Sequence, residues 1–262
     1  MYKGLRIVAT IEARMTSSRL PGKVLLEYCE KTNLQHMVER LKRSRYVDDV
    51  VIATTVNETD SPIVELCKKI DCNYSRGSEE DVLLRVLEAA KSAKADVIVE
   101  ITGDCPMIDW RHVDFLVEKY EDEGVDYCAN IIKRSFPRGF DTQVFSVAAL
   151  DKVNHLTKSP IDHEHVSLYM YTHRELFSLS NWEAQGLLNH PEIEVTLDMK
   201  EDYELIREIY EKLYPQNPDF SAEDVINCIL EDPGLYKRSQ GGHRKDVFKE
   251  QKEWEENYGQ RV

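Results

Sequence analysis

The sequence lacks several features that mark membrane, secreted and metal-cluster proteins. Its 262 residues contain no apolar run near the roughly 20 residues of a membrane span. The N-terminus has neither the basic start and apolar core nor the small-residue cleavage site of a signal peptide. The six cysteines are scattered and form no close metal-binding pairs. We therefore expect a cytoplasmic protein with reduced, mostly buried thiols.

Positive charge is also scarce. The chain has 34 lysines and arginines against 48 aspartates and glutamates, a formal net charge of -14. This field repels polyanions, so we expect no nucleic-acid partner. A small anion can still bind where cations are concentrated. One stretch does concentrate them: "ARMTSSRLPGK", residues 13–23, carries Arg14, Arg19 and Lys23.

The first half of the chain alternates short apolar runs with helical patterns four times. Strands are predicted at 5–11, 48–55, 95–102 and, more briefly, in "CNYSRG"; helices are predicted after an Asn33 N-cap, from Ser61, through "SEEDVLLRVLEAAKSA" and at 110–121. This alternation predicts an α/β fold whose mainly parallel sheet has helices on both faces. Ligands bind beyond the carboxyl ends of such strands. Residues 13–23 and "TGDCPMID" at 102–109 both follow predicted strands, so both should open onto one crevice.

The second half predicts an α+β continuation that lines the other wall of the crevice. "RGFDTQVFSVAALDKV" indicates a strand and a helix, and "DHEHVSLYMYTH" a helix. "LFSLSN" and "IEVTLD" are candidate strands, and "KEDYELIREIYEKL" is a strongly amphipathic helix. We expect one domain over residues 1–236, followed by a polar tail or helical arm over 237–262.

The cationic stretch has the composition of a phosphate-binding loop. Its cations alternate with Thr16, Ser17, Ser18 and Gly22, and hydroxyls, backbone N–H groups and cations together can surround phosphate oxygens. It is not a Walker A loop, because no serine or threonine follows the Gly-Lys pair. By pattern alone, a phosphate site and an ordinary solvated loop remain equally open.

Two aspartates are candidate Mg²⁺ ligands. Asp104 follows a predicted parallel strand and Gly103, and a hard cation prefers carboxylate and phosphate oxygens. Asp198 ends a candidate strand before a helix. The alternatives are a turn or N-cap aspartate at Asp104 and a helix N-terminal acid at Asp198.

Other polar residues also allow two interpretations. His163 and His165 would point roughly 200° apart on a helix, so they predict no zinc site. Arg138 in "FPRGFD" suits a substrate carboxylate or phosphate, or is simply a surface arginine.

Six motifs in order resemble a known family. They are "ARMTSSRLPGKVL", "RGSEEDVLLRV", "ITGDCPMID", "PRGFDTQVF", "EHV" and "VTLDMKEDYELI". The chain resembles the cytidylyltransferases that include spore-coat polysaccharide biosynthesis proteins, and is more distantly similar to the CMP-sugar synthetases for octulosonate and acylneuraminate. The likeness covers residues 5–213.

The resemblance implies a Rossmann-like nucleotide-diphospho-sugar transferase fold and a Mg²⁺-dependent reaction. A nucleoside triphosphate, most readily CTP, would react with an acidic sugar or a small phosphorylated or phosphonylated acceptor and release pyrophosphate. The residues that this implies for the nucleotide are Ala13, Arg14, Ser18, Arg19, Lys23, Gly77, Ser78, Asp81, Thr102 and Gly103. Within that set, Gly77, Ser78, Asp81 and Thr102 would lie near base and ribose.

The remaining implied roles concern chemistry and the acceptor. Arg14, Lys23 and Asp104 would be catalytic, Asp104 and Asp198 would bind Mg²⁺, and Arg138, Asp141 and His165 would face the acceptor. Thr102 stands where the octulosonate enzymes carry glutamine, so another nucleotide such as GTP stays open. A glycosyltransferase or a nucleotide-binding regulatory protein is the alternative of another class. The aromatic and histidine mixture of "HEHVSLYMYTH" favours a homodimer.

Overall fold

The first half of the chain forms four parallel strands with helices between them. The computed structural model describes residues 1–240 and Trp254. The strands are β1 (Ile7–Glu12), β4 (Asp49–Thr55), β5 (Asn73–Gly77) and β6 (Val97–Thr102), and the helices between them are α1 (Asn33–Leu41), α2 (Ser61–Lys69) and α3 (Val82–Ser92). In the order β5-β4-β1-β6, every neighbouring pair is parallel. The predicted parallel sheet is therefore confirmed.

The second half adds three strands and makes the sheet mixed. After α4 (Trp110–Glu123) come β7 (Tyr127–Ala129), β8 (Gln143–Ser146), α5 (Val147–Leu156) and β9 (Leu179–Asn181). The seven-stranded order is β5-β4-β1-β6-β8-β7-β9. Strand β8 runs antiparallel to β6 and to β7, while β9 is parallel to β7.

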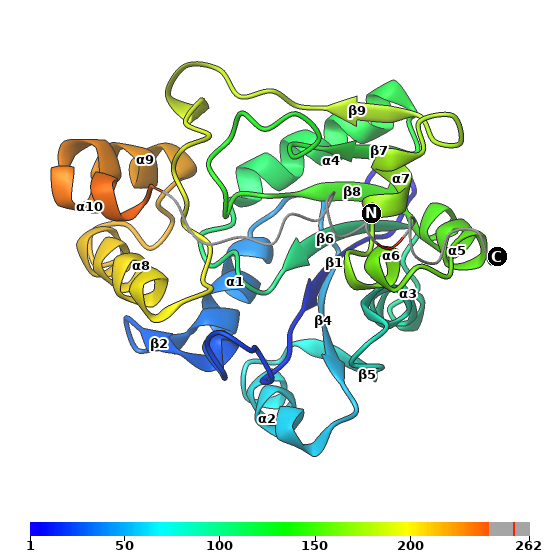
Figure 1. The fold of residues 1–262 in the computed structure, drawn as a ribbon, viewed down its shortest axis with the longest axis horizontal. Coiled ribbons are helices and arrows are strands. Elements are labelled where there is room, and N and C mark those ends of the chain that lie inside the picture. Colours follow the sequence, from blue (N-terminus) through cyan, green and yellow to red (C-terminus); the bar gives the residue numbers. More distant parts are fainter. Residues whose placement is uncertain (241–253, 255–262) are drawn as a thin grey trace.

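Helices cover both faces of the sheet, because successive strand side chains point to opposite sides. On one face, Ile7 and Ile11 of β1 pack in a cluster with residues of α1, α2 and α4. On the other, Val8 of β1 packs with residues of α3 and α5. Figure 1 shows this layered arrangement, in which β1 runs through the middle of the molecule.

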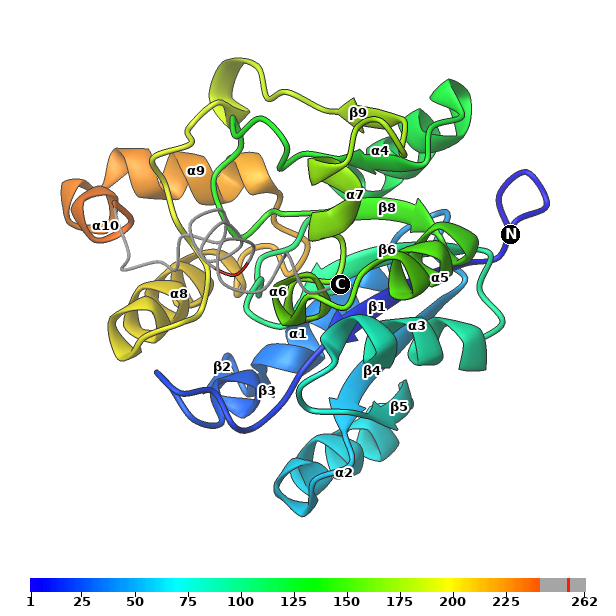
Figure 2. The ribbon, with the colours of Figure 1, turned by 45° about the vertical axis from the view of Figure 1, so that its right-hand side comes forward.

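Three helices gather at one end of the molecule (Figures 1 and 2): α8 (Lys200–Leu213), α9 (Ala222–Glu231) and α10 (Pro233–Arg238). They form a separate apolar cluster around Tyr210. Buried Arg40 of α1 joins this cluster to the loop between β6 and α4. Its Nε donates to the Ile108 carbonyl at 2.6 Å and its Nη2 to the Phe220 carbonyl at 2.8 Å. Helix α10 runs past the expected domain end at 236, and residues 241–253 and 255–262 of the expected tail lie outside the described residues.

Three local expectations were wrong. "IEVTLD" is no strand: isolated bridges join Glu194 to Arg138 and Ile193 to Gln240. "DHEHVSLYMYTH" is two short helices, α6 (Pro160–Glu164) and α7 (Leu168–Thr172), because Val166 between them has a φ of 50° that no right-handed helix allows. Thr32, rather than Asn33, caps α1 by accepting from the Gln35 N–H.

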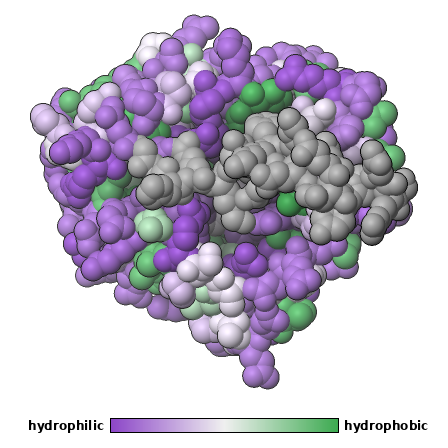
Figure 3. All heavy atoms as spheres, in the orientation of Figure 1, coloured by the Kyte–Doolittle hydropathy of each residue, from purple (hydrophilic) through white to green (hydrophobic). Residues whose placement is uncertain are grey.

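The small elements surround the first loop and the helical end. They are β2 (Glu27–Tyr28), β3 (Lys31–Thr32) and the 3₁₀ turns η1 (Lys23–Leu25), η2 (Glu58–Asp60) and η3 (Gly186–Leu188). The face drawn in Figure 3 is mainly hydrophilic, with apolar residues in small separate groups. In the described part of the chain, every helix is too short or too polar to cross a membrane.

Candidate active site

The cationic loop, residues 13–23, begins at the carboxyl end of β1. It is held by the buried Asp60, which lies in the connection between β4 and α2. The Met15 N–H donates to Asp60 at 2.8 Å. Asp60 also accepts from the Thr55 hydroxyl at 2.6 Å, which fixes its orientation. The loop closes where the Gly22 N–H donates to the Met15 carbonyl at 2.9 Å, and Gly22 has a φ of 73° that favours glycine. The loop is thus a shaped part of the fold rather than a solvated connection.

The second loop is held against β1 by a glycine. The Gly103 N–H donates to the Glu12 carbonyl at 3.1 Å. A Cβ on Gly103 would lie 2.5 Å from that oxygen, so only glycine permits the approach. The buried Asn33 amide donates to the Gly103 carbonyl at 2.9 Å. These contacts place Asp104 next to the first loop.

The segment before α8 brings the second candidate metal ligand to the first. The Leu197 N–H donates to the Asp104 carbonyl at 2.8 Å, so Asp198 reaches the same edge without a strand. The Asp198 carboxylate pairs with Arg19 at 2.7 Å and with Lys23 at 2.9 Å. The Thr102 hydroxyl donates to the Asp104 carboxylate. Two carboxylates and two cations from three distant segments therefore meet at one place.

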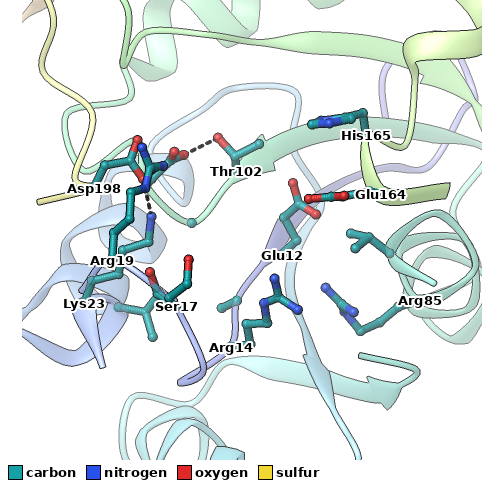
Figure 4. Close-up of a pocket in the computed structure, with 16 residues that line it drawn as sticks. Glu12, Arg14, Ser17, Arg19, Lys23, Arg85, Thr102, Glu164, His165 and Asp198 are labelled. Carbon is teal, nitrogen blue, oxygen red and sulfur yellow. Dashed lines mark hydrogen bonds and ion pairs between the residues drawn. The ribbon is translucent and has the colours of Figure 1, made fainter. Parts of the chain in front are cut away.

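These segments line a cavity of about 420 Å³ (Figure 4). The predicted residues that line it are Ala13, Arg14, Ser18, Arg19, Lys23, Thr102, Gly103, Asp104, His165 and Asp198. An adjoining cavity of about 150 Å³ shares Arg19, Thr102, Asp104 and Asp198, and adds the predicted Arg138 and Asp141. The predicted nucleotide and acceptor residues thus fall largely into two connected spaces.

Three predicted nucleotide residues line neither cavity. Gly77 ends β5, and its carbonyl accepts from the Val56 N–H at 3.0 Å. The Ser78 hydroxyl accepts from the Asp81 N–H at 3.0 Å. Asp81 caps α3 through the Leu84 N–H at 2.9 Å and contacts His163 Nδ1 at 2.7 Å. These bonds account for the three residues as parts of the β5–α3 turn, and a contact with base or ribose stays a prediction.

The smaller cavity has a preformed ion pair. Arg134 donates through both terminal nitrogens to the two carboxylate oxygens of Asp141, in the forked geometry that such pairs favour. Arg138 lies in the turn before Asp141, and its carbonyl accepts a hydrogen bond from the Val195 N–H at 2.9 Å. Gly139 follows with a φ of 103°, and a Cβ there would lie 2.8 Å from Val195. Arg134 thus neutralises Asp141, and the Arg138 guanidinium, whose Nε lies 4.0 Å from a carboxylate oxygen of Glu194, is a second cation at this cavity.

Sequence reasoning missed three charged residues of the larger cavity: Glu12, Arg85 and Glu164. A signal for two of them was present. Glu12 ends an apolar strand directly before the cationic loop, and Arg85 interrupts the buried face of α3 between Val82 and Val86. An ion on an otherwise apolar surface favours a site over a simple core position.

Burial dominates the electrostatics of this end of the cavity. It raises the pKa of Glu12 to about 7, while Arg85 opposes the shift and Asp104 adds to it. Burial also lowers the pKa of the Arg85 guanidinium, against the effect of Glu12. The cavity therefore offers carboxyl groups in different environments: Glu12 is half-buried and desolvated at the end of β1, and Asp198 is paired with cations.

The donor set also fits a hard divalent cation. Asp104 and Asp198 line both cavities, their segments are joined by the Leu197 hydrogen bond, and carboxylate oxygens are ligands that Mg²⁺ prefers. Mg²⁺ keeps several waters and completes its shell with substrate phosphates, for which two protein carboxylates suffice.

Known proteins are similar to this chain in sequence. The family model described as cytidylyltransferase matches residues 8–226. The chain is 34% identical over 232 residues to the spore coat polysaccharide biosynthesis protein SpsF of Bacillus subtilis, covering 87% of this chain and 95% of that protein. It is 27% identical over 233 residues to the 3-deoxy-manno-octulosonate cytidylyltransferase of Solibacter usitatus, covering 82% and 91%.

A solved structure agrees with these matches. The structure of a cytidylyltransferase from Leptospira borgpetersenii superposes with a TM-score of 0.84 at 32% identity, covering 92% of this chain and 99% of that one.

Proposed function

The chain belongs to the cytidylyltransferase family, as its motifs led us to expect, and from that premise we propose a specific reaction. The protein is a nucleotidyltransferase that joins CTP to an acidic sugar, or to a small phosphorylated or phosphonylated acceptor, with Mg²⁺ as cofactor and pyrophosphate as the second product. Two similar proteins support this choice: one is named for spore-coat polysaccharide biosynthesis, and the other for cytidylyl transfer to 3-deoxy-manno-octulosonate. We place the reaction in surface-polysaccharide or related biosynthesis.

The observation that carries the proposal is the meeting of Arg19, Lys23 and Asp198 beside Asp104 in one cavity. Without a ligand, the two cations neutralise Asp198. A triphosphate supplies stronger anionic partners for Arg19 and Lys23, and this exchange frees the Asp198 carboxylate. The same residues can therefore hold the nucleotide and offer a metal ligand, whereas an ordinary helix N-terminal acid needs no such partners.

Positioning accounts for most of the chemistry. The hydroxyl of Ser18 and the charges of Arg14, Arg19 and Lys23 hold and neutralise the triphosphate beside Asp104. Asp104 and Asp198 would hold Mg²⁺, which would supply further neutralisation of the phosphate charge. The acceptor oxygen attacks the α-phosphorus in line as pyrophosphate leaves.

The smaller cavity is the proposed acceptor site. Arg138 binds the acceptor's carboxylate or phosphate, and Asp141, held by Arg134, is positioned for sugar hydroxyls. His165 reaches the larger cavity from the end of α6, where the two substrates meet. An acceptor that is already ionised at neutral pH needs no strong general base.

The decisive experiment measures pyrophosphate release with each nucleoside triphosphate and a panel of acidic sugars, sugar phosphates and phosphonates. We expect turnover with CTP and an anionic acceptor, and none after metal chelation. Turnover with GTP would instead assign a guanylyltransferase, while release with neutral acceptors alone would contradict the acceptor proposed here.

We also propose that the enzyme acts in the cytoplasm as a homodimer. Tyr169 stacks on His173 and Tyr171 packs near Tyr127, so part of the aromatic stretch that favoured a dimer already covers the chain's own core. Solution scattering at micromolar concentration checks the assembly. A monomeric mass would contradict the dimer without affecting the reaction.

A further inference from the structure

The turn that carries His165 into the larger cavity has a strained backbone. Residues 165–167 join α6 to α7, and Val166 in the middle of this turn has a φ of 50°. A β-branched residue rarely adopts this left-handed conformation, because its Cβ crowds the carbonyl oxygen. Such a backbone persists only where the surrounding structure enforces it, and it is found mainly at functional sites. The contacts that enforce this turn therefore bear on the cavity.

The residues that the turn presents to the cavity come directly before the strained position. Glu164 and His165 line the larger cavity, and Figure 4 draws both side chains directed toward its middle. The His165 N–H donates to the Ile161 carbonyl at 3.0 Å, which joins the residue to the end of α6. The Ser167 N–H donates to the His165 carbonyl at 2.6 Å. A movement of Ser167 is therefore transmitted directly to His165.

Two buried side chains anchor this turn to the sheet. Val166 is fully buried in the apolar cluster that also contains Phe145. Ser167 is buried as well, and its hydroxyl donates to the side-chain oxygen of Gln143 at 2.5 Å. Apolar burial has no preferred direction, whereas a hydrogen bond does. The Ser167 hydroxyl is therefore the anchor that sets the orientation of the turn.

Gln143 is itself held in place by its neighbours. It lies on β8, where it pairs with Glu100 of β6 and with Ala129 of β7. Its side-chain oxygen also accepts from the Tyr127 hydroxyl, and its amide donates to the Glu100 carboxyl at 2.7 Å. Burial raises the pKa of Glu100 well above its usual range, which favours the neutral carboxyl. A buried network whose members bond to one another is rigid.

The place of this network in the sheet indicates a role beyond stability. Glu100 lies two residues after Ile98 on β6, so both side chains point to the same face. Gln143 lies two residues before Phe145 on β8, and Ile98 and Phe145 belong to one apolar cluster. Apolar side chains of the same shape would stabilise this face about as well. They would not supply a fixed acceptor for the Ser167 hydroxyl.

We propose that Ser167 and Gln143 are positioning residues, which hold the strained turn so that the His165 imidazole faces the acceptor. Ser167 lines neither cavity, so it acts through His165 rather than on a substrate. Loss of its hydroxyl lets Val166 relax toward an ordinary backbone conformation, and this relaxation moves His165 away from the acceptor. The inference rests on the proposed function, because it takes His165 to contact the acceptor.

Ser167→Ala in the full chain tests this role. The Gln143 oxygen keeps its bond from Tyr127, so no buried acceptor is left unpaired. The acceptor used is the acidic sugar, sugar phosphate or phosphonate that gives the fastest pyrophosphate release with CTP. We expect its kcat/KM to fall on the order of 10–10²-fold, as for a misplaced contact to a reactant. CTP affinity by calorimetry should change less than about twofold, because the loop at 13–23 holds the triphosphate.

A double-variant cycle separates positioning from general destabilisation. His165→Ala leaves no imidazole to position, so adding Ser167→Ala should lower kcat/KM less than about twofold further. Ser167→Cys keeps a weak S–H donor of similar size and should retain an intermediate rate. The matched control is Ser44→Ala, which removes a half-buried hydroxyl that donates to Asp114 in the connection between α1 and β4. It should leave the acceptor kinetics unchanged in both backgrounds.

A second readout does not depend on turnover. NMR spectra of the histidine imidazoles report the surroundings of each ring, and the His165 signal is the one that is missing from His165→Ala. We expect Ser167→Ala to shift or split this signal and Ser44→Ala to leave it unchanged. If Ser167→Ala fails to fold, Ser167→Cys gives the same two readouts with smaller changes.

Each contrary outcome has its own meaning. A full loss of kcat/KM from Ser167→Ala in the His165→Ala background would overturn the positioning role and leave the proposed reaction intact. An unchanged His165 signal in Ser167→Ala would do the same. Absence of pyrophosphate release by the natural protein with every triphosphate and acceptor would overturn the proposed function, and the NMR comparison would still show whether Ser167 orients His165.

Discussion

The two cavities differ in how their residues are held. The larger one is built from loops that directly follow β1 and β6, so its residues are placed by the parallel sheet itself. The smaller one depends on residues 138–139 and 193–198, which meet through isolated hydrogen bonds and one bridge outside the sheet. The proposed nucleotide site is therefore placed by the parallel strands themselves, whereas the proposed acceptor site is built at the edge of the sheet from segments outside the strands.

The largest effects are expected from the carboxylates that both cavities share, Asp104 and Asp198. Asp104→Asn keeps the side chain's shape and removes its charge. We expect turnover to fall on the order of 10²–10³-fold, because phosphate charge is no longer stabilised through the metal. Metal-free CTP binding should survive or improve, since one negative charge near the triphosphate is gone. Pyrophosphate release and calorimetry measure the two effects.

Asp198→Asn tests whether Asp198, from the second half of the chain, forms one metal site together with Asp104. It should lower turnover as Asp104→Asn does, and the double variant should lose little more, because residues acting as a unit are not additive. Near-normal turnover of Asp198→Asn at limiting Mg²⁺ would make Asp198 only a partner of Arg19 and Lys23.

The residues that follow β1 and β6 could be predicted from the sequence. The contacts that bring the second half of the chain to the same cavities could not. The loop at 13–23 and Asp104 were found because each follows an apolar run, and parallel strands end at one edge. Asp198 was found for a wrong reason: the predicted strand before it does not form. Asp198 is placed instead by the hydrogen bond from Leu197 to Asp104 and by its ion pairs with Arg19 and Lys23, contacts between residues far apart in sequence that no local pattern encodes.

Ion pairs and burial also could not be predicted from the local sequence. Nothing in "FPRGFD" shows that Arg134 will neutralise Asp141, or that Val195 will crowd Gly139. Glu12 was missed because an acid at a strand end is an ordinary loop feature until its burial is known.

The two close-packed glycines, Gly103 and Gly139, allow each cavity to be altered separately. In Gly103→Ala, the new Cβ would meet the Glu12 carbonyl at 2.5 Å, which forces the second loop away from β1. We expect a destabilisation of about 1–3 kcal/mol, together with weaker CTP binding. Gly139→Ala should cost a similar amount but raise the acceptor KM and leave CTP affinity nearly unchanged. Denaturant titration and steady-state kinetics give the two readouts, and identical kinetic defects in both variants would show that the cavities are not separable.

Single cations should give the next smaller effects. Lys23→Ala should weaken CTP binding by about 1.5–3 kcal/mol, since it removes a charged contact to the triphosphate. Arg14→Ala should act in the same direction. Arg138→Ala is the matched change in the smaller cavity and should spare CTP affinity while raising the acceptor KM. Unchanged nucleotide affinity in both Lys23→Ala and Arg14→Ala would show that the triphosphate does not bind to the loop at residues 13–23.

The smallest expected effect is on stability and depends on pH. Burial raises the pKa of Glu12 from 4.5 to about 7. The folded state therefore binds the proton more tightly than the unfolded state, and the stability that neutral Glu12 provides is lost as pH rises from the unfolded to the folded pKa. Glu12→Gln cannot ionise and should keep that stability, so it should exceed the natural protein by about 1–2 kcal/mol near pH 8 and converge with it toward pH 5. Denaturant titrations across this range measure the difference, and Glu88→Gln, at an exposed position of α3, should show no such convergence. A Glu12→Gln variant that is less stable near pH 8 would mean that attraction to Arg85 outweighs burial and that Glu12 is ionised in the folded protein.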